Sequence, residues 1–457
     1  VKDNNVFVKK LDYGTVVPVT TDGERNKVIN GVPDWVYQEE FGMLNSLCWS
    51  PDNLTLAFIR WDESQVPMYS MTMYEGACSP NKDYALYPGR FDFKYPVAGE
   101  KNSEVSVMCY DVENRTLKTA KLPDGVGYYI PHMAFSGDAT KLMVSTLNRT
   151  QNDFHIYAVN PRSLIAKSVY AEKSDTWFDS ELANSVRYYD TYFVIPSEKS
   201  GFTQLYQYSL SGALIKQLTT GNENVTAYYG HDAKRGLFYY QRTNGPLNRT
   251  VECVDAKGKV KALDGGVGTT SATFSSDFSY FIKKFSDINT PTQYTVVNAA
   301  NKTVRKLEMN EDYAKTYCSS AVPKKEFFKM TSDGVELNGY IIKPVDFDES
   351  KKYPVIMSQY SGPGSQQVLN QWGVDWQQYF AMQGYVICCV DGRGTGGRGK
   401  AFQSLVYMNL GKYESIDQVA AADYMASKPW VDKNKIGIWG WSYGGYEVLM
   451  AMSQPNA

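Results

Sequence analysis

A serine in a glycine-rich turn is the first feature of this sequence that could do chemistry. The stretch Gly440-Trp441-Ser442-Tyr443-Gly444-Gly445 follows the strand-like run KIGIWGW and precedes the helical run YEVLMAMSQ. A strand, a tight turn and a helix are the context in which a GxSxG motif presents a nucleophile. The N–H of Tyr443 would then lie at a helix N-terminus, where it could donate to a developing oxyanion. We therefore predict that Ser442 is a nucleophile; the alternative is an incidental glycine-rich turn.

A second oxyanion donor should come from the loop after an earlier strand of the same sheet. The apolar run YPVIMSQ ends at Tyr360, which opens the loop Tyr360-Ser-Gly-Pro-Gly364. A phenol is a directional hydrogen-bond donor, so Tyr360 is a candidate for this role. A tyrosine packed at the start of a loop fits the same residues, and the sequence alone leaves both interpretations open.

The base that would activate Ser442 is missing from the expected place. In this kind of fold the acid and then the histidine follow the serine along the chain. The three histidines, His132, His155 and His231, all lie far upstream, and residues 443–457 contain neither His nor Asp. We expect both partners to lie after residue 457, and the 457 residues alone to be inactive as a hydrolase.

Up to about residue 320 the sequence is a series of short alternating strands rich in Tyr, Val, Phe and Thr. An aromatic residue followed three positions later by Asp recurs at Trp49, Phe135, Tyr229 and Phe274. The interval from Tyr229 to Phe274 fits one four-stranded propeller blade, and the interval from Phe135 to Tyr229 fits two. The interval from Trp49 to Phe135 fits one blade with an insertion of roughly thirty residues. We predict a β-propeller over residues 1–320, incomplete at its N-terminus, with about five blades and a partial one.

The pattern changes after residue 320. FFKMTSDGVELNGYIIKP predicts a hairpin that turns at Asp333-Gly334. The strand-like runs YPVIMSQY, YVICCVD and KIGIWGW then alternate with the helical runs QWGVDWQQYFAMQ and SIDQVAAADYMAS. This alternation predicts a parallel sheet covered on both faces, with the adjacent Cys388 and Cys389 facing opposite sides. We predict the first part of an α/β-hydrolase domain over residues 321–457, truncated after the helix that follows Ser442.

Three motifs together resemble the prolyl oligopeptidase family of serine peptidases: GWSYGG, DGRGTGG at residues 391–397, and YSGPGSQ, all after a propeller. DWVYQEE at residues 34–40 is similar to the acidic motif of its dipeptidyl peptidase IV subfamily, bacterial type, although Gln38 stands where members usually have a third Glu. The resemblance implies an eight-bladed propeller, a homodimer, and release of Xaa-Pro or Xaa-Ala dipeptides from peptide N-termini. It also implies Ser442 as nucleophile, Tyr360 and Tyr443 as oxyanion donors, and Tyr443 as a wall of the proline pocket.

The acidic stretch has a chemistry of its own. PDWVYQEEFG predicts a short helix capped by Asp34 and ended by Gly42, on which Glu39 and Glu40 could both reach one cation. A peptide's α-amino group is largely protonated at neutral pH and suits such a clamp. Two solvated helix carboxylates are the alternative, and the resemblance favours the clamp. Arg393 in DGRG is expected to be a structural ion-pair residue.

Composition excludes several partners. A net charge of -2, from 47 basic and 49 acidic residues, gives no bulk attraction for nucleic acid or an anionic membrane. No apolar run is long enough to span a membrane, and the seven cysteines show no metal-type spacing, so we expect no metal or cofactor. We expect a periplasmic or secreted enzyme acting on peptides with a free N-terminus; a cytoplasmic location is the alternative. An oligopeptidase or acylaminoacyl peptidase of the same family, and a catalytically silent propeller scaffold that binds peptides or proteins, are the alternative functions.

Overall fold

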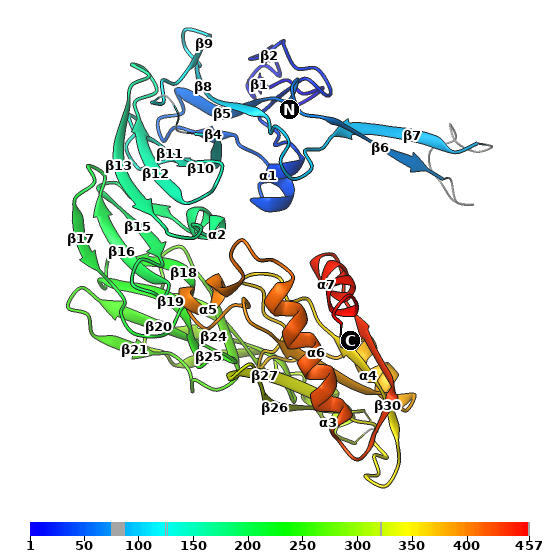
Figure 1. Ribbon diagram of the computed structural model, residues 1–457. Coiled ribbons are helices and arrows are strands. Elements are labelled where there is room, and N and C mark those ends of the chain that lie inside the picture. Colours follow the sequence, from blue (N-terminus) through cyan, green and yellow to red (C-terminus); the bar gives the residue numbers. More distant parts are fainter. Residues whose placement is uncertain (75–86, 124, 126, 320–321, 456–457) are drawn as a thin grey trace. The chain divides into compact units, whose positions relative to one another are not determined.

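The computed structural model describes residues 1–74, 87–123, 125, 127–319 and 322–455 (Figure 1). The chain divides into two compact units, residues 1–195 with 207–216, and residues 196–206 with 217–457. Strands predominate up to residue 308, and helices become frequent only after that. The predicted domain boundary near residue 320 stays a prediction.

The first unit consists mainly of antiparallel sheets. Strands β1 and β2 pair with each other, β5 lies between β3 and β8 in a sheet that also contains β4 and β9, and β10 to β13 form a four-stranded sheet. The strands are β1 (Phe7–Lys9), β2 (Val16–Pro18), β3 (Val28–Asn30), β4 (Cys48–Trp49), β5 (Thr55–Asp62), β8 (Glu104–Asp111), β9 (Thr116–Thr119), β10 (Tyr129–Phe135), β11 (Leu142–Leu147), β12 (Asp153–Val159) and β13 (Ala166–Lys173). The helices are α1 (Trp35–Glu40) and α2 (Ser180–Asn184).

The predicted insertion is a separate hairpin. Strands β6 (Met68–Met73) and β7 (Gly89–Lys94) lie between β5 and β8 in the sequence and pair only with each other among the described residues. The hairpin projects from the rest of the first unit (Figure 1). Every residue of β6 is exposed and no residue of β7 is fully buried, so neither strand contributes to a core of the described residues.

Further four-stranded arrangements follow. Strands β14 (Arg187–Tyr188), β15 (Tyr192–Ser197), β16 (Gln204–Ser209) and β17 (Leu214–Gln217) form one sheet, and the division between the units falls within its sequence range. In the second unit two groups of four strands join through one parallel pair, Arg249 with Thr269. They are β18 (Val225–Asp232), β19 (Leu237–Asn244), β20 (Asn248–Asp255) and β21 (Val260–Ala262), then β22 (Thr269–Phe274), β23 (Tyr280–Asp287), β24 (Thr290–Asn298) and β25 (Thr303–Glu308).

The recurring aspartates have a structural role. Each follows or ends a strand that pairs antiparallel with the next strand along the chain, and each accepts a backbone N–H two or three residues further on. Asp52 accepts from Leu54, Asp138 from Thr140, Asp232 from Arg235 and Asp277 from Ser279, over 2.8 to 3.1 Å. Aspartate favours such turns because its short carboxylate reaches the nearby N–H groups. The repeat in the sequence therefore marks a turn between two consecutive antiparallel strands.

The last five strands form one mixed sheet in the order β26-β27-β29-β28-β30. They are β26 (Lys325–Ser332), β27 (Val335–Ile342), β28 (Tyr353–Ser358), β29 (Val386–Asp391) and β30 (Val431–Trp439). The predicted hairpin is confirmed, since Ser332 pairs with Val335 around Asp333 and Gly334, both at positive φ. Strand β28 runs parallel to β29 and to β30, whereas β27 is antiparallel to β29, so the predicted parallel pairing holds for three of the five strands.

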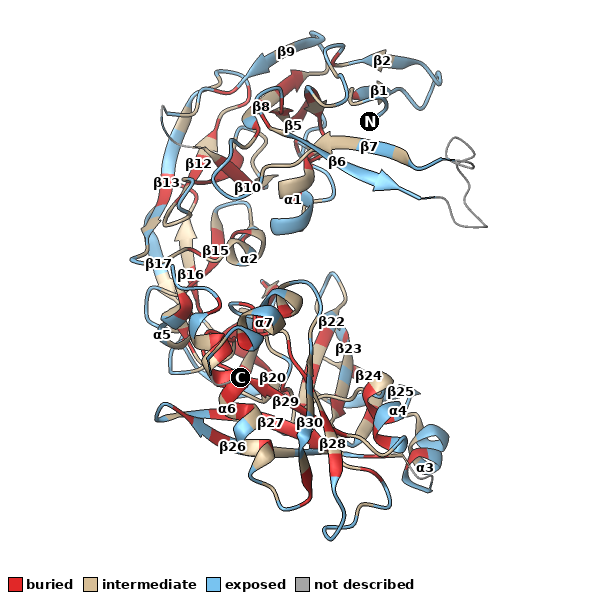
Figure 2. Ribbon diagram, turned by 45° about the vertical axis from the view of Figure 1, so that its right-hand side comes forward, coloured by how far each residue is buried: buried red, intermediate tan, exposed pale blue. Residues whose placement is uncertain are grey.

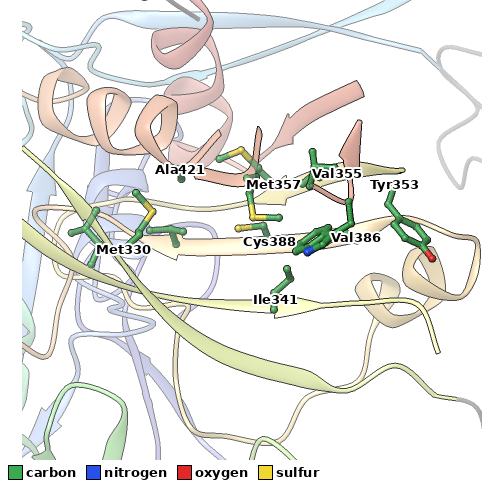
Figure 3. Packing of buried hydrophobic residues seen from close by; sticks show 13 residues of the cluster. Met330, Ile341, Tyr353, Val355, Met357, Val386, Cys388 and Ala421 are labelled. Atoms are coloured by element: carbon green, nitrogen blue, oxygen red, sulfur yellow. The ribbon is translucent and has the colours of Figure 1, made fainter. Parts of the chain in front are cut away.

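Helices pack against both faces of this sheet, as predicted. One core contains Cys388 together with Ala421 and Met425 of α6, and the other contains Cys389 together with Ala381 of α4. Figure 3 shows the first of these cores, and Figure 2 shows buried residues concentrated in the central strands. The helices of this unit are α3 (Glu311–Ser319), α4 (Trp376–Met382), α5 (Lys400–Gln403), α6 (Lys412–Ala426) and α7 (Tyr443–Met452). No helix in the described part of the chain is long and apolar enough to cross a membrane.

Candidate active site

Ser442 lies at the turn between β30 and α7 in a backbone conformation that few residues adopt. Its φ is +56° and its ψ is -117°, and the residue is exposed. A non-glycine residue with these angles is strained, and surrounding structure must hold it there. The geometry is that of a nucleophile elbow, in which the serine hydroxyl is presented to solvent above the end of a strand.

Two glycines make this turn possible. A Cβ at position 440 would lie 2.3 Å from the carbonyl oxygen of Gly444, and a Cβ at position 444 would lie 2.7 Å from the carbonyl oxygen of Gln359. Both distances are far shorter than a carbon–oxygen contact, so only glycine fits at positions 440 and 444. Gly445 is less constrained, because its Cβ would meet nothing closer than 3.6 Å.

Tyr443 is the first residue of α7, and its N–H has no backbone acceptor among the described residues. An unpaired N–H at a helix N-terminus can donate to an anion. The side chain is held separately, because its phenol donates to Oε1 of Glu414 over 2.9 Å. Burial and the charge of Glu414 raise the pKa of the Tyr443 phenol above its usual value, so the phenol remains a donor.

Tyr360 lies beside this turn at the end of β28. Its ring centroid is 6.1 Å from that of Tyr443, and its hydroxyl makes no hydrogen bond to another residue that the structure describes. The preceding Gln359 ties the two segments together, since its N–H donates to Trp439 O over 3.1 Å and its Nε2 donates to Gly444 O over 2.8 Å. The structure therefore brings Ser442, Tyr443 and Tyr360 together. Gln359 was not predicted as a site residue from the sequence, although it directly precedes Tyr360.

Arg393 is an ion-pair residue, as predicted. Its guanidinium contacts the buried carboxylate of Asp417 at 2.7 Å and that of Asp333 at 3.1 Å. Its backbone N–H also donates to Asp417, over 2.7 Å. Since Asp417 lies on α6 and Asp333 in the β26–β27 turn, Arg393 fastens the loop after β29 to both elements.

The predicted acidic helix is α1, in the first unit. Asp34 caps it by accepting from the N–H of Tyr37 over 3.0 Å, and Gly42 follows its end with φ of +60°. Glu39 and Glu40 are both exposed, and neither makes an ion pair or hydrogen bond with another described residue. Partial desolvation and the neighbouring charge of Glu39 raise the pKa of Glu40 above its usual value. Two adjacent, unpaired carboxylates are thus available to a cationic ligand.

Helix α1 is anchored by buried groups. The phenol oxygen of Tyr37 accepts from the N–H of Ile130 over 2.8 Å, and its ring packs edge-on against Trp61. Asp34 also accepts from the hydroxyl of Ser103 over 2.6 Å. The amide of Gln38, which stands where the subfamily usually has a third Glu, donates to Pro33 O over 2.7 Å. These contacts fix the helix, although it has only six residues.

The three histidines belong to the strand-rich part of the chain. His132 and His155 lie on β10 and β12 in the first unit, and His231 lies on β18, where its ring stacks on Phe238 at 4.0 Å. The hydroxyl of Ser442 makes no hydrogen bond to any described residue. Among the residues that the structure describes, no group of three or more His, Cys, Asp or Glu side chains is placed to hold a metal ion.

Comparison with known families identifies the class of protein. Residues 1–292 match the model of the dipeptidyl peptidase IV N-terminal region, and residues 372–457 match the model of the prolyl oligopeptidase family. The chain therefore belongs to the dipeptidyl peptidase IV branch of the prolyl oligopeptidase family. A β-propeller followed by a hydrolase domain is the fold class that these matches fit, as predicted, while the number of blades stays a prediction.

Individual proteins of this family show which members the chain is similar to. The chain is 46% identical to Porphyromonas gingivalis dipeptidyl peptidase 4, whose crystal structure it matches with a TM-score of 0.93, covering 100% of this chain and 64% of that one. A putative dipeptidyl aminopeptidase IV from Bacteroides ovatus gives 25% identity and a TM-score of 0.84, covering 99% and 68%. A probable dipeptidyl-aminopeptidase B from Emericella nidulans is 33% identical over 99% of this chain and 53% of its own length. The chain spans about half the length of the curated relatives it matches.

Proposed function

We propose that this chain is part of a serine exopeptidase that releases Xaa-Pro or Xaa-Ala dipeptides from the N-termini of peptides. The observation that carries the proposal is the exposed, strained Ser442 at the turn between β30 and α7. The names of the relatives, dipeptidyl peptidase 4 and dipeptidyl-aminopeptidase B, favour an exopeptidase over an oligopeptidase or acylaminoacyl peptidase.

The proposed reaction is acyl transfer. The Oγ of Ser442 attacks the carbonyl carbon after the second residue of the substrate, and its proton passes through a general base to the leaving amine. The N–H of Tyr443 and the hydroxyl of Tyr360 donate to the oxyanion that forms. Water then attacks the acyl-enzyme and releases the dipeptide. No described residue bonds the Ser442 hydroxyl, so the proposal assigns the role of general base to none of them.

Glu39 and Glu40 supply the proposed exopeptidase selectivity. Their exposed and unpaired carboxylates suit the substrate's ammonium group, and charge-assisted hydrogen bonds are worth about 1.5 to 3 kcal/mol each. An amine fixed in this way sets the scissile bond two residues from the N-terminus. A ring wall from Tyr443 would favour a compact second residue such as proline.

The remaining proposals concern the whole protein. We propose an eight-bladed propeller when complete, with the boundary to the hydrolase domain near residue 320, and a periplasmic or secreted location.

We also propose a homodimer, for which the β6–β7 arm is the candidate surface, because large exposed apolar patches mark interaction sites. The exposed apolar residues of this arm are Met68, Tyr69, Met71, Met73 and Phe91. Sedimentation of the full-length protein and of its Met71→Asp variant tests the dimer, and fractionation of the source cells tests the location.

The enzyme proposal is tested on the full-length protein. A fluorophosphonate probe should label it, Ser442→Ala should abolish the labelling, and mass spectrometry should find dipeptides released from peptides that begin Xaa-Pro. Labelling with cleavage inside long peptides would instead favour an oligopeptidase. Absence of both labelling and cleavage would leave the silent scaffold as the better interpretation.

A further inference from the structure

A buried acidic group holds the side chain that follows the candidate nucleophile. Glu414 lies in the first turn of α6 and is completely buried. Its Oε1 accepts from the phenol of Tyr443, whereas its Oε2 has no hydrogen-bond partner among the described residues. Tyr443 thus connects α6 to the turn that carries Ser442, and the proposed reaction uses only its N–H and its ring.

A second glutamate lies buried close to the first. Glu447 is on α7, five residues after Ser442, and is also completely buried. Neither of its carboxyl oxygens has a hydrogen-bond partner in the described part of the chain, and no described Lys or Arg pairs with Glu447 or Glu414. A buried carboxylate with no donor and no counter-ion is strongly unfavourable, so the group must hold a proton or acquire a partner.

The charges around Glu447 favour a proton. The acidic groups that face it are Glu414 and Asp417 on α6, and the phenols of Tyr443 and Tyr446 lie on its own helix. Asp417 is neutralised by Arg393, but Glu414 has only the uncharged phenol as its donor. Burial and the charges of Glu414 and Asp417 raise the pKa of Glu447 to about 8. Glu447 is therefore mostly protonated at neutral pH.

We propose that Glu414 is a positioning residue for the reaction, holding the phenol of Tyr443 against α6, and that Glu447 retains a proton so that the two buried carboxyl groups carry one negative charge between them. The proposal rests on the proposed function, because it assigns a role beside the same serine. When Glu447 loses its proton, two unscreened charges face each other between α6 and α7. Their repulsion displaces Tyr443, and with it the oxyanion donor and the pocket wall.

The first experiment measures pH profiles of the full-length protein. We compare kcat/KM and the rate of fluorophosphonate labelling between pH 6 and pH 10 for the wild type, Glu447→Gln, and the exposed control Glu349→Gln. Wild type and control should share an alkaline decline with a midpoint near pH 8, of about tenfold or more if one such contact is lost. Glu447→Gln cannot ionise and should lack this decline.

Two results of this experiment would overturn the proposal. An alkaline decline of the same midpoint and depth in Glu447→Gln would assign it to another group. A Glu447→Gln protein that is inactive or less stable at pH 7 would mean that Glu447 is ionised and paired with a cation outside the described residues.

The second experiment tests whether Glu414 acts through Tyr443. Glu414→Gln keeps an oxygen that can accept from the phenol and should stay within about twofold of wild type in kcat/KM, whereas Glu414→Ala should lose about tenfold or more. Tyr443→Phe should lose a similar factor, and adding Glu414→Ala to it should cost nothing further. Multiplying losses, or failure of Glu414→Gln to retain activity, would contradict the positioning role.

If Glu414→Ala does not fold, measurements of thermal stability on the other variants still test the coupling between Glu414 and Tyr443. Tyr443→Phe leaves a buried charge without its donor, so Glu414→Gln should raise Tm in that background more than in the wild type. Equal effects in both backgrounds would reject the coupling. Failure of the proposed function is recognised separately: a protein that labels with the probe but releases no dipeptide is not an exopeptidase, and its labelling rates still decide the role of the glutamates.

Discussion

At the scale of single residues, the candidate site depends on groups that differ in how much the backbone constrains them. Ser442 adopts its strained conformation only because Gly440 and Gly444 have no Cβ atoms to collide with the opposing backbone. Tyr360 has no such constraint, and its hydroxyl is not engaged by any described neighbour. A hydroxyl that is free in the resting site can be directed to an oxyanion without breaking an existing bond.

Tyr360→Phe is predicted to lower kcat while largely sparing KM. The phenol should matter chiefly when negative charge develops on the substrate oxygen, and loss of one such donor costs about 2.7 to 4 kcal/mol where it has been measured, or about 100 to 1,000-fold in kcat. Steady-state kinetics of the full-length protein measure this. An unchanged kcat would assign Tyr360 to packing.

The stability of the protein should respond to pH through Glu447. Its folded pKa, about 8, lies above the ordinary value of 4.5, so its contribution to stability is fully present below pH 4.5 and is lost as the pH rises toward 8. The wild type should lose up to about 1.4 kcal/mol per pH unit relative to Glu447→Gln in this window. Chemical denaturation of both proteins at pH 5, 6.5 and 8 measures the difference, and parallel curves would show that Glu447 does not titrate there.

At the scale of elements, α1 is short enough that its contacts outside the helix must fix it. Isolated helices of this length are unstable in water, so the orientation of Glu39 and Glu40 depends on the anchors Asp34 and Tyr37. Asp34 binds both the helix N-terminus and the hydroxyl of Ser103. The carboxylate of Asp34 therefore joins the N-terminus of α1 to Ser103, which lies elsewhere in the same unit.

Asp34→Ala is predicted to lower the free energy of unfolding by about 2 to 4 kcal/mol, because it removes a helix cap worth about 1 kcal/mol and leaves the buried hydroxyl of Ser103 without its acceptor. It should also weaken binding of free-amine substrates. Asp179→Ala is the matched control, since Asp179 caps α2 through Glu181 N alone and should cost only about 1 kcal/mol. Equal losses in unfolding experiments on the two variants would contradict the anchoring role of Asp34.

Turns, caps and single elements that depend on neighbouring residues could be predicted from the sequence. The order of the strands in the sheet could not be predicted. The turn at Asp333-Gly334, the cap at Asp34 and the strand–turn–helix around Ser442 depend on neighbouring residues, and each was predicted. The position of β29 between β27 and β28 depends on long-range pairing that no local pattern reveals. Glu414 was also missed, because a glutamate in the first turn of a helix normally faces solvent and its partner Tyr443 lies 29 residues away.

At the scale of the whole molecule, the proposed function needs both units. The first carries the exposed carboxylates of Glu39 and Glu40, and the second carries Ser442, Tyr443 and Tyr360. Chemistry at Ser442 that ignores the amine measures the second unit alone, so a small fluorophosphonate serves as the internal control.

The most direct measurement compares H-Gly-Pro and N-acetyl-Gly-Pro substrates on the full-length wild type, Glu39→Gln and Glu40→Gln. Each variant should lower kcat/KM for the free amine by about 10 to 150-fold, the equivalent of one charge-assisted contact, with fluorophosphonate labelling almost unchanged. Acetylation should reduce cleavage far more in the wild type than in the variants. If both variants cleave H-Gly-Pro substrates like the wild type, or if acetylated substrates are cleaved equally well, the exopeptidase account is wrong.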